Sequence, residues 1–326
     1  MDFRTFTAGD NDNDRRLDKI IRIIVPSISL SEIYKAIRKG LIKVNDKKAA
    51  AEYRVQSGDK ISVAEFFFKP SDSNPKASDD KNKISDSDFP DIPVLFKNEN
   101  IIIFNKPRNI SVHGSGNKTS NSNSTITLEA YTKALYEKEH PTAASLSFTP
   151  GPLHRIDRFT TGIVAFSWSL NGARWFSENI KNHTIQKKYI GIVQGNLKAQ
   201  QKWQSFIKNK EADGSQKKFH TVIATDAPEE GKAALTIVTP LAHGKINGLE
   251  LTLTEFEIHT GRHHQIRAQA AQNGFPLYGD TAYGGARNPQ NTYFLHAAEL
   301  QIPENPVGLP QIIKASIPED FPLPVS

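Results

Sequence analysis

A polar stretch over residues 69–91 limits how this chain of 326 residues can fold, because it offers a hydrophobic core almost nothing to bury. It consists almost entirely of Ser, Asp, Asn, Lys and Pro, and segments of that composition stay solvated. We therefore expect a flexible linker at 69–91, a small domain over residues 1–68 and a larger domain over residues 92–326. A second polar patch at 115–124 predicts a long surface loop within the larger domain.

Two amphipathic helices open the small domain. Apolar side chains recur at helical spacing over residues 17–24, so we expect a first helix that buries one face. Ser29 and Glu32 have the spacing of a capping box, which predicts the start of a second helix, and Gly40 predicts its end. Local patterns alone therefore predict both helices.

Short strands at 42–44 and 61–63 complete this small α/β module, whose core we expect over residues 15–64. Its polar side carries seven basic side chains: Arg15, Arg16, Lys19, Lys35, Arg38, Lys39 and Lys43. The whole chain has a formal net charge of +6, which suits a polyanionic partner. Charge alone leaves two interpretations open, an ordinary solvated face and a surface that binds phosphates.

Composition excludes several classes of protein. The chain has no cysteine, so it has no disulfide framework, no cysteine-ligated zinc site and no thiolate nucleophile. The N-terminal residues do not resemble a signal peptide, and no apolar run approaches the roughly 20 residues that a membrane-spanning helix needs. We therefore expect a soluble cytoplasmic protein without a membrane partner.

Helices and strands are mixed along the larger domain. Apolar runs predict strands at 94–96, 101–104, 163–166 and 187–193, of which the first two should be buried. Helical patterns predict helices near 126–138 and 171–182, and a last helix that starts at Thr260 and ends at Asn273 and Gly274. This order does not alternate as in a parallel sheet, so it favours an α+β fold.

Residues 154–162 read His-Arg-Ile-Asp-Arg-Phe-Thr-Thr-Gly and place one acidic side chain, Asp157, between two arginines. Because nearby cations favour the charged form of a carboxyl group, Asp157 should stay ionised. An ionised, oriented carboxylate can act as a nucleophile, a base or a structural partner, and the residues themselves leave all three open. The motif runs into the apolar residues 163–166, so we expect Asp157 on a loop that enters a strand.

Three other motifs have weaker support. A kinase catalytic loop is disfavoured because Asp157 comes one position late, no Asn stands at position 161, and no glycine-rich nucleotide loop is present. Residues 114–119 lack the Gly-Lys pair of a phosphate-binding loop. On a helix, His263 and His264 would point about 100° apart with no carboxylate or cysteine nearby, so we expect no metal site there.

Residues 15–64 resemble the RNA-binding module named after ribosomal protein S4. The resemblance rests on Arg-Leu-Asp-Lys at 16–19 and on Gly-Leu-Ile-Lys-Val-Asn at 40–45. In such modules two helices present basic side chains to the phosphates of structured RNA, a contact that positions the protein without reading sequence. The resemblance implies that the seven basic residues named above bind RNA.

Residues 94–300 resemble the RluA-type pseudouridine synthases, which isomerise uridine in RNA. The family signature His-Arg-Leu-Asp-Arg-x-Thr-Ser-Gly matches residues 154–162, with Ile156 and Thr161 as conservative differences. Further family motifs follow in the family's order, namely Asn-Lys-Pro at 105–107, Val-His at 112–113, Lys-x-Tyr-x-x-x-Val-x-Gly at 187–195, Gly-Lys-Ala-Ala-Leu-Thr at 231–236, Thr-Gly-Arg-x-His-Gln-Ile-Arg at 260–267 and Gly-Asp-x-x-Tyr-Gly at 279–284. The resemblance implies an α+β pseudouridine synthase fold, with a mixed, mainly antiparallel sheet and a central active-site cleft.

The same resemblance implies roles for single residues. Asp157 matches the catalytic aspartate, which either adds to the base or sugar or removes a sugar proton to give a glycal. Tyr189 matches the tyrosine beside a flipped-out base, and Arg267 the arginine that pairs with the catalytic carboxylate. Arg155 matches the residue that fills the stack where the uridine leaves. Substrate binding, by shaping the loop or contacting phosphate, is also expected of His154, Thr160, Lys106 and His113.

The resemblance implies neither a cofactor nor a metal, and the module in front is similar to that of members that modify ribosomal RNA. We therefore expect uridines of 23S ribosomal RNA as substrate, and a monomer. A tRNA-directed member and a non-catalytic RNA-binding protein with the same fold remain alternatives. A nucleoside hydrolase is disfavoured, because such sites usually activate water through a metal cluster.

The chain departs from the family pattern in two places. Arg108 and Asn109 stand where the family usually has a glycine, and Gln269 stands where many members have histidine. Asn tolerates a left-handed backbone, so we expect the turn at Asn109 to persist.

Overall fold

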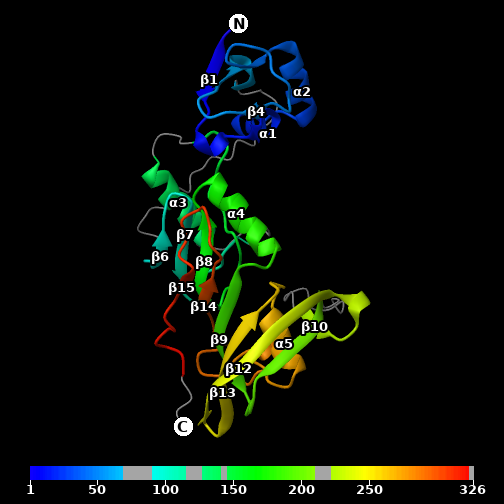
Figure 1. The fold of residues 1–326 in the computed structure, drawn as a ribbon, viewed down its shortest axis with the longest axis vertical. Coiled ribbons are helices and arrows are strands. Elements are labelled where there is room, and N and C mark those ends of the chain that lie inside the picture. Colours follow the sequence, from blue (N-terminus) through cyan, green and yellow to red (C-terminus); the bar gives the residue numbers. More distant parts are fainter. Residues whose placement is uncertain (69–89, 115–126, 141–144, 210–221, 323–326) are drawn as a thin grey trace. The chain divides into compact units, whose positions relative to one another are not determined.

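The structure is a computed structural model, and it describes residues 1–68, 90–114, 127–140, 145–209 and 222–322 (Figure 1). The expected loop at 115–124 and nearly all of the expected linker at 69–91 lie outside these residues. The division of the chain into domains at that linker therefore stays a prediction.

The chain forms two compact units. Unit 1 comprises Met1–Pro90, Tyr131–Gly151 and Trp168–Asn171. Unit 2 comprises Asp91–Ala130, Pro152–Ser167 and Gly172–Ser326. Unit 1 thus includes two segments that the sequence placed in the larger domain.

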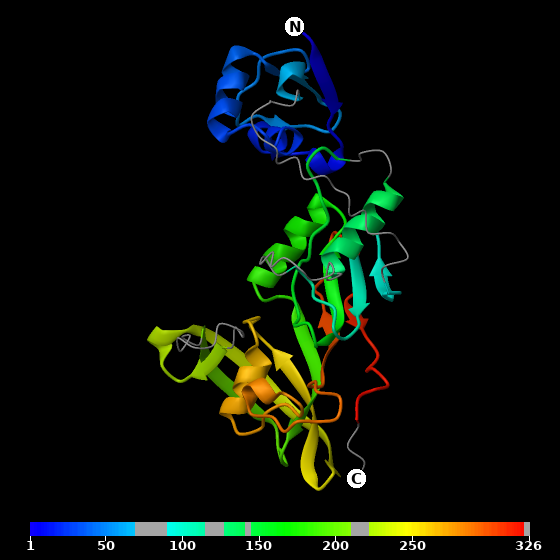
Figure 2. The same ribbon diagram turned by 180° about the vertical axis from the view of Figure 1, so that it is seen from behind.

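Unit 1 combines a small sheet with two helices around one core. The sheet has the order β1 (Phe3–Thr7), β5 (Lys60–Ala64), β3 (Ile42–Val44), and both pairings are antiparallel. A second pair joins β2 (Arg15–Arg16) to β4 (Arg54–Val55). Apolar side chains of α1 (Leu17–Ile24) and α2 (Leu30–Lys39) form one buried cluster with those of β3 and β5. Two views agree that β1 lies on the opposite side of the unit from α2 (Figures 1 and 2).

Both predicted helices of unit 1 are confirmed. The Glu32 backbone N–H donates to Ser29 Oγ (3.3 Å), and the Ser29 N–H donates to Glu32 Oε2 (2.8 Å), so the capping box forms as expected. Gly40 ends α2 with a φ of 72°, in the left-handed region that glycine favours. Strand β1 was not predicted, because most of its residues are exposed and its sequence carries no continuous apolar pattern.

Residues 145–147 pack against the N-terminal part of unit 1. The carboxylate of the buried Asp12 accepts hydrogen bonds from Ser145 Oγ (2.7 Å), Ser147 Oγ (2.6 Å) and the Leu146 N–H (2.8 Å). The Leu146 side chain packs against the apolar core. Arg15 Nη1 donates to the Ser147 carbonyl at 2.6 Å. The guanidinium of Arg15 thus holds this segment, and its expected role in RNA binding stays a prediction.

Unit 2 is built on one ten-stranded sheet. Its strands are β6 (Val94–Lys97), β7 (Ile101–Lys106), β8 (Thr161–Ser167), β9 (Gln186–Gln194), β10 (Gln201–Asn209), β11 (Val222–Thr225), β12 (Lys232–Ile246), β13 (Leu249–Ile258), β14 (Leu295–Gln301) and β15 (Ile312–Lys314). The order is β11-β10-β12-β13-β9-β14-β8-β7-β6, with β15 paired to β14. Only the pairing of β14 with β8 is parallel among the described strands, so the expected α+β fold with a mainly antiparallel sheet is confirmed.

The remaining helices are α3 (Leu128–Glu139), most of which belongs to unit 1, and α4 (Leu170–Lys181) and α5 (Gln265–Gln272), which belong mainly to unit 2. Ala268 of α5 packs with Ile207, Val222 and Ala234 from three strands of the sheet. The buried Gln269 donates to Ser205 Oγ (2.9 Å) and to the Trp203 carbonyl (3.1 Å). Gln269 therefore anchors α5 to the sheet. None of the helices in the described ranges is long and apolar enough to cross a membrane.

Two local expectations were wrong. The last helix does not start at Thr260, because residues 260–264 form an irregular turn and His264 adopts a left-handed backbone with φ of 50°. Strand β6 is not fully buried, because it lies at an edge of the sheet and exposes Val94. The expected left-handed turn at Asn109 is confirmed by its φ of 70°.

Four segments of unit 2 converge where β8, β9, β13 and β14 lie together in the sheet. They are the loop before β8, the middle of β9, the turn between β13 and α5, and the residues just before β14. Gly162 permits the close approach of β14 to β8, since it has a φ of 103° and a Cβ there would collide with the Ala297 carbonyl oxygen. These segments carry the side chains of the candidate site.

Candidate active site

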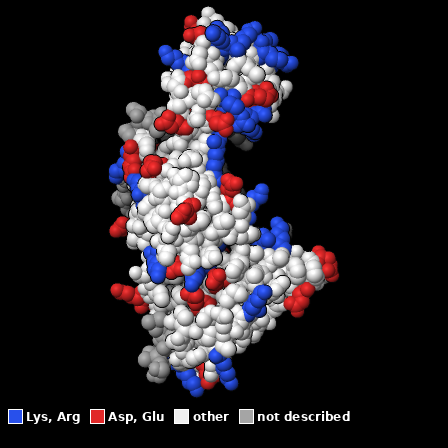
Figure 3. Space-filling view, viewed as in Figure 1, with Lys and Arg blue, Asp and Glu red and all other residues white. Residues whose placement is uncertain are grey.

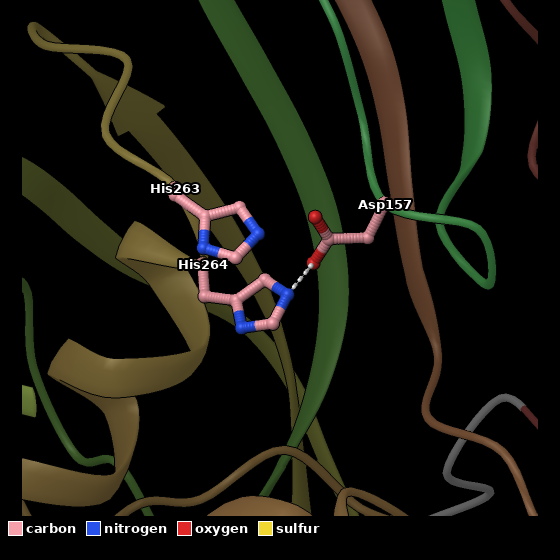
Figure 4. A group of neighbouring side chains, drawn as sticks. All are labelled: Asp157, His263 and His264. Carbon is pink, nitrogen blue, oxygen red and sulfur yellow. Dashed lines mark ion pairs between the residues drawn. The ribbon is translucent and has the colours of Figure 1, made fainter. Parts of the chain in front are cut away.

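Asp157 lies on the loop that enters β8, as the sequence predicts. The Thr160 N–H donates to the Asp157 carbonyl at 3.1 Å, which closes a tight turn around the residue. Two cavities meet here, one of about 590 Å³ and one of about 440 Å³, and both are lined by Arg155, Asp157, His263 and His264. The Asp157 carboxylate points toward the two histidines (Figure 4).

Arg267 joins Asp157 to a second carboxylate, Asp280. Its Nη1 donates to Asp157 Oδ2 at 3.2 Å, while Nε and Nη2 donate to the two oxygens of Asp280 at 2.7 and 2.9 Å. The rings of Tyr293 and Tyr283 lie 4.5 and 4.8 Å from the guanidinium. Burial alone would lower the pKa of Arg267, but the hydrogen bonds to Asp280 and the surrounding negative charge raise it above the ordinary value. The expected pairing of Arg267 with Asp157 is therefore present.

Two tyrosines stand near the Asp157 carboxylate. The Tyr293 hydroxyl lies 3.4 Å from Asp157 Oδ2 and 3.3 Å from Thr160 Oγ1. Tyr189, on β9, is buried and lines the smaller cavity. Burial, and next the charge of Asp157, raise the pKa of both phenols. Both hydroxyls therefore keep their protons at neutral pH and can donate to a carboxylate or a substrate.

His264 is held as a neutral ring. Arg267 Nη1 lies 2.9 Å from His264 Nε2, and a guanidinium only donates, so Nε2 must accept and the ring proton must be on Nδ1. Nδ1–H then donates to the Tyr283 hydroxyl at 2.9 Å. Burial lowers the pKa of His264 to about 4, although the charge of Asp157 opposes the shift. Nε2 also lies 3.4 Å from Asp157 Oδ2 (Figure 4), and Arg267 Nη1, with two hydrogens, can serve both acceptors.

The sequence argument against a metal site assumed that His263 and His264 lie on a helix with no carboxylate nearby, and both assumptions were wrong. The two residues precede the helix, and ligand atoms of both lie within 4.8 Å of one another and of a carboxylate oxygen of Asp157. The three still do not fit a metal ion. The imidazole rings are stacked 3.8 Å apart, so their lone pairs lie in nearly parallel planes, and the Arg267 guanidinium already occupies the acceptor of His264.

The remaining predicted site residues have different settings around Asp157. His154 Nε2 accepts the Ala165 N–H at 3.1 Å, and burial, together with Lys187, lowers the pKa of His154 to about 3, so it shapes the loop as a neutral ring. His113 lines the larger cavity and lies 3.1 Å from Glu129. Arg155 is exposed where the two cavities meet.

Lys106 is buried, and its ammonium has partners in the backbone. It is 0% exposed, and Nζ donates to the carbonyl oxygens of Pro107 (2.9 Å), Ile110 (2.9 Å) and Arg158 (3.0 Å). Burial lowers its pKa to about 7, and the charge of Asp157 opposes the shift. The three carbonyl oxygens use all three hydrogens of the ammonium. Lys106 therefore supports the loop that carries Asp157.

Sequence reasoning missed four contributors to the site: Asp280, Tyr283, Tyr293 and His264. Three of them belong to motifs at 260–267 and 279–284, so the signal was present but no role was assigned. Tyr293 belongs to none of the quoted motifs, and only the pairing of β14 with β8 and β9 brings it to Asp157.

The basic face of unit 1 is partly used by internal contacts. Lys and Arg gather on the side of unit 1 that carries α1 and α2 (Figure 3). Arg16 makes two hydrogen bonds to Asp18, at 3.0 and 2.9 Å, and Lys43 lies over the Phe3 ring. Four predicted side chains are exposed: Lys19, Lys35, Arg38 and Lys39.

Replacing Asp280 by Ala should destabilise unit 2 by about 3 kcal/mol or more, because it leaves a buried guanidinium with Asp157 as its one carboxylate partner. The Arg267 and Asp280 side chains are only 10% and 1% exposed. Asp320→Ala is the control, since Asp320 pairs with Arg108 but is 56% exposed, and it should cost at most about 1 kcal/mol. Urea unfolding measures both. Equal losses for the two variants would contradict the importance of the buried pair.

Stability should fall as the pH is lowered from 6.5 to roughly 5. The folded protein holds the pKa of His264 near about 4 and that of His154 near about 3, below the ordinary 6.5, so the unfolded chain binds more protons in this window. Each histidine should contribute up to about 1.4 kcal/mol per pH unit to the free energy of unfolding. His264→Gln should reduce this slope, because it removes one of the histidines whose pKa burial lowers. A flat profile in the wild type would refute the two neutral rings.

Comparison with known proteins agrees with this geometry. Residues 100–272, more than half of the chain, match the family model for RNA pseudouridylate synthase, and residues 15–61 match the S4 domain. Ribosomal large subunit pseudouridine synthase C of Vibrio vulnificus is 27% identical over 318 residues, which cover 94% of this chain and 90% of the relative. The protein of the same name from Rickettsia prowazekii is 27% identical over 314 residues, with coverage of 94% and 95%.

A solved structure is similar in fold. Human RNA pseudouridylate synthase domain containing 1 superposes with a TM-score of 0.53 at 19% identity, covering 71% of this chain and 84% of the human chain. The family match spans the loop, the strand and the helix that carry Asp157, Tyr189 and Arg267. This chain therefore belongs to the RNA pseudouridylate synthase family and carries an S4 domain near its N-terminus.

Proposed function

We propose that this protein converts uridines of ribosomal RNA to pseudouridine and that Asp157 is its nucleophile. The observation that carries the proposal is the setting of the Asp157 carboxylate where two cavities meet. Arg267 and Tyr293 both engage Oδ2, and within the described ranges no hydrogen bond involves Oδ1. One oxygen is thus held and the other faces open space, which is the arrangement that attack on a substrate requires.

The reaction needs little beyond an oriented carboxylate. The bond between C1′ and N1 breaks, the base rotates, and C1′ joins C5. The hydrogen on C5 leaves and N1 gains one, so atoms and electrons balance without an oxidant or a reductant, and we propose that no cofactor takes part. Asp157 either adds to the substrate or removes a sugar proton, and the hydrogen bond from Arg267 orients the carboxylate in both routes.

Tyr189 and Arg155 have settings that suit contacts to the flipped nucleotide. Tyr189 is a buried, protonated phenol in the smaller cavity, so its ring can stack on the base and its hydroxyl can relay the proton at C5. Arg155 is exposed beside Asp157, where a long planar side chain can occupy the gap left in the RNA stack.

Ribosomal RNA is the substrate we propose, because the relatives from Vibrio vulnificus and Rickettsia prowazekii are named ribosomal large subunit pseudouridine synthases and align along nearly their whole length. Such a substrate favours a cytoplasmic location. We also propose that the protein is a monomer. The S4 domain would bind the RNA through phosphates, using its exposed basic side chains.

Asp157→Asn should abolish turnover without unfolding the protein, because the amide keeps the shape of the side chain and cannot act as the nucleophile. Release of tritium from 5-tritiated uridine in ribosomal RNA measures the reaction, and circular dichroism measures folding. Asp320→Asn, a change of the same kind at an exposed carboxylate of unit 2, should keep full activity. Activity of a folded Asp157→Asn protein within tenfold of wild type would exclude the nucleophile role.

Replacing Lys35 and Lys39 of α2 by Gln should weaken RNA binding and flatten its salt dependence by about 0.7–0.9 for each phosphate that the variant no longer binds. Substitution is a cleaner test than deletion of residues 1–68, because Leu146 packs against the core that a deletion would remove. Lys47→Gln with Lys60→Gln is the matched control, with two exposed lysines of the same unit that lie outside α1 and α2. Binding titrated at several salt concentrations gives the slopes, and equal slopes for both double variants would argue against RNA binding by α2.

A further inference from the structure

The smaller cavity beside Asp157 has a strongly basic wall. Four of its lining residues carry a cationic side chain: Arg155, Lys181, Lys187 and Arg262. Among the residues that the structure describes, Asp157 is the one carboxylate that lines it. The cavity measures about 440 Å³, which is ample for a phosphate and part of a sugar. Its charge therefore favours an anion close to the reacting centre.

Lys187 is the unusual member of this wall. It lies on β9 and is only 8% exposed, yet across the described parts of the chain its ammonium makes no hydrogen bond and no ion pair. Nζ lies beside Gly261, where a Cβ would come within 3.4 Å of it. The next residue, Lys188, points to the other face of the strand and pairs with Glu255 at 3.4 Å.

An unpaired ammonium in such a place costs stability. Burial lowers the pKa of Lys187, which shows that its charged form is disfavoured in the free protein. Lys106, equally buried, has three carbonyl oxygens as partners, so this fold is able to satisfy a buried lysine from its own backbone. For Lys187 an anionic ligand would recover the missing interaction.

We propose that Lys187 forms the base of a phosphate-binding subsite that takes a backbone phosphate of the RNA next to the reacting nucleotide. The proposal rests on the proposed function for the identity of the polymer. The two cavities share Asp157, so a nucleotide bound at Asp157 lies next to the smaller cavity, and a neighbouring phosphate of its chain can reach Lys187. Arg155, Lys181 and Arg262 surround the same space and add to its positive potential.

The first test uses inorganic phosphate as the probe on the full-length protein. A ligand that binds only the folded state raises its melting temperature. Phosphate should raise the melting temperature of the wild type and of Lys188→Met more than that of Lys187→Met, measured against chloride at equal ionic strength. Without phosphate, Lys187→Met should melt at the same temperature as the wild type or higher, because it removes an unpaired buried charge. An equal response to phosphate in all three proteins would overturn the proposal.

The second test locates the phosphate in RNA. A ribosomal RNA fragment is prepared with one neutral methylphosphonate at a time around the target uridine, and binding is measured to Asp157→Asn protein, so turnover plays no part. One position should weaken binding roughly tenfold in this background and in the background that also carries Lys188→Met. With Lys187→Met or Lys187→Gln added, that position should have no further effect. If every position weakens binding equally with and without Lys187, the subsite does not exist.

Tritium release and the response to phosphate distinguish a failure of the proposed function from a failure of the Lys187 subsite. If tritium release persists in Asp157→Asn while the phosphate response still depends on Lys187, the nucleophile assignment fails and the subsite stands. If Asp157→Asn is inactive but the phosphate response is the same in wild type and Lys187→Met, the subsite fails and the proposed function stands.

Discussion

The buried guanidinium of Arg267 is the group on which the arrangement of the site depends. A cation that is only 10% exposed requires carboxylate partners, and Arg267 has two, Asp280 through a fork of two hydrogen bonds and Asp157 through one. Its faces are covered by the rings of Tyr283 and Tyr293. These partners come from separate segments of the chain, so the position of the Asp157 carboxylate is a product of packing within unit 2.

The Arg267 guanidinium also decides which groups around Asp157 donate hydrogen bonds and which accept them. Arg267 and Tyr293 donate toward Oδ2, and His264, whose Nε2 accepts from Arg267, is confined to its neutral form. A metal ion at this place would have to displace a guanidinium and use two imidazoles whose lone pairs do not converge. The site is therefore suited to holding the Asp157 carboxylate in one orientation.

Two buried lysines of unit 2 differ in the partners of their ammonium groups. Lys106 gives its three hydrogens to backbone carbonyls and supports the loop of Asp157. Lys187 has no such partners in the part of the chain that the structure describes, and it lies in the wall of a basic cavity. Hydrogen bonds therefore compensate the burial of the Lys106 ammonium, whereas nothing in the described part of the chain compensates the burial of the Lys187 ammonium. The unsatisfied one is the better candidate for a ligand contact.

Features that depend on residues close together in the chain could be predicted from the amino-acid sequence. The capping box at Ser29, the left-handed turn at Asn109, the loop position of Asp157 and the mixed α+β class all followed from local patterns or ordered motifs. The hydrogen-bond partners of the site residues could be found only from the tertiary structure. Asp280 pairs with Arg267, Tyr293 contacts Asp157, three carbonyl oxygens accept from Lys106, and the Ser147 carbonyl accepts from Arg15. The physical reason is that these contacts join segments far apart in the chain, and their geometry is set by strand pairing and burial, which no local pattern encodes.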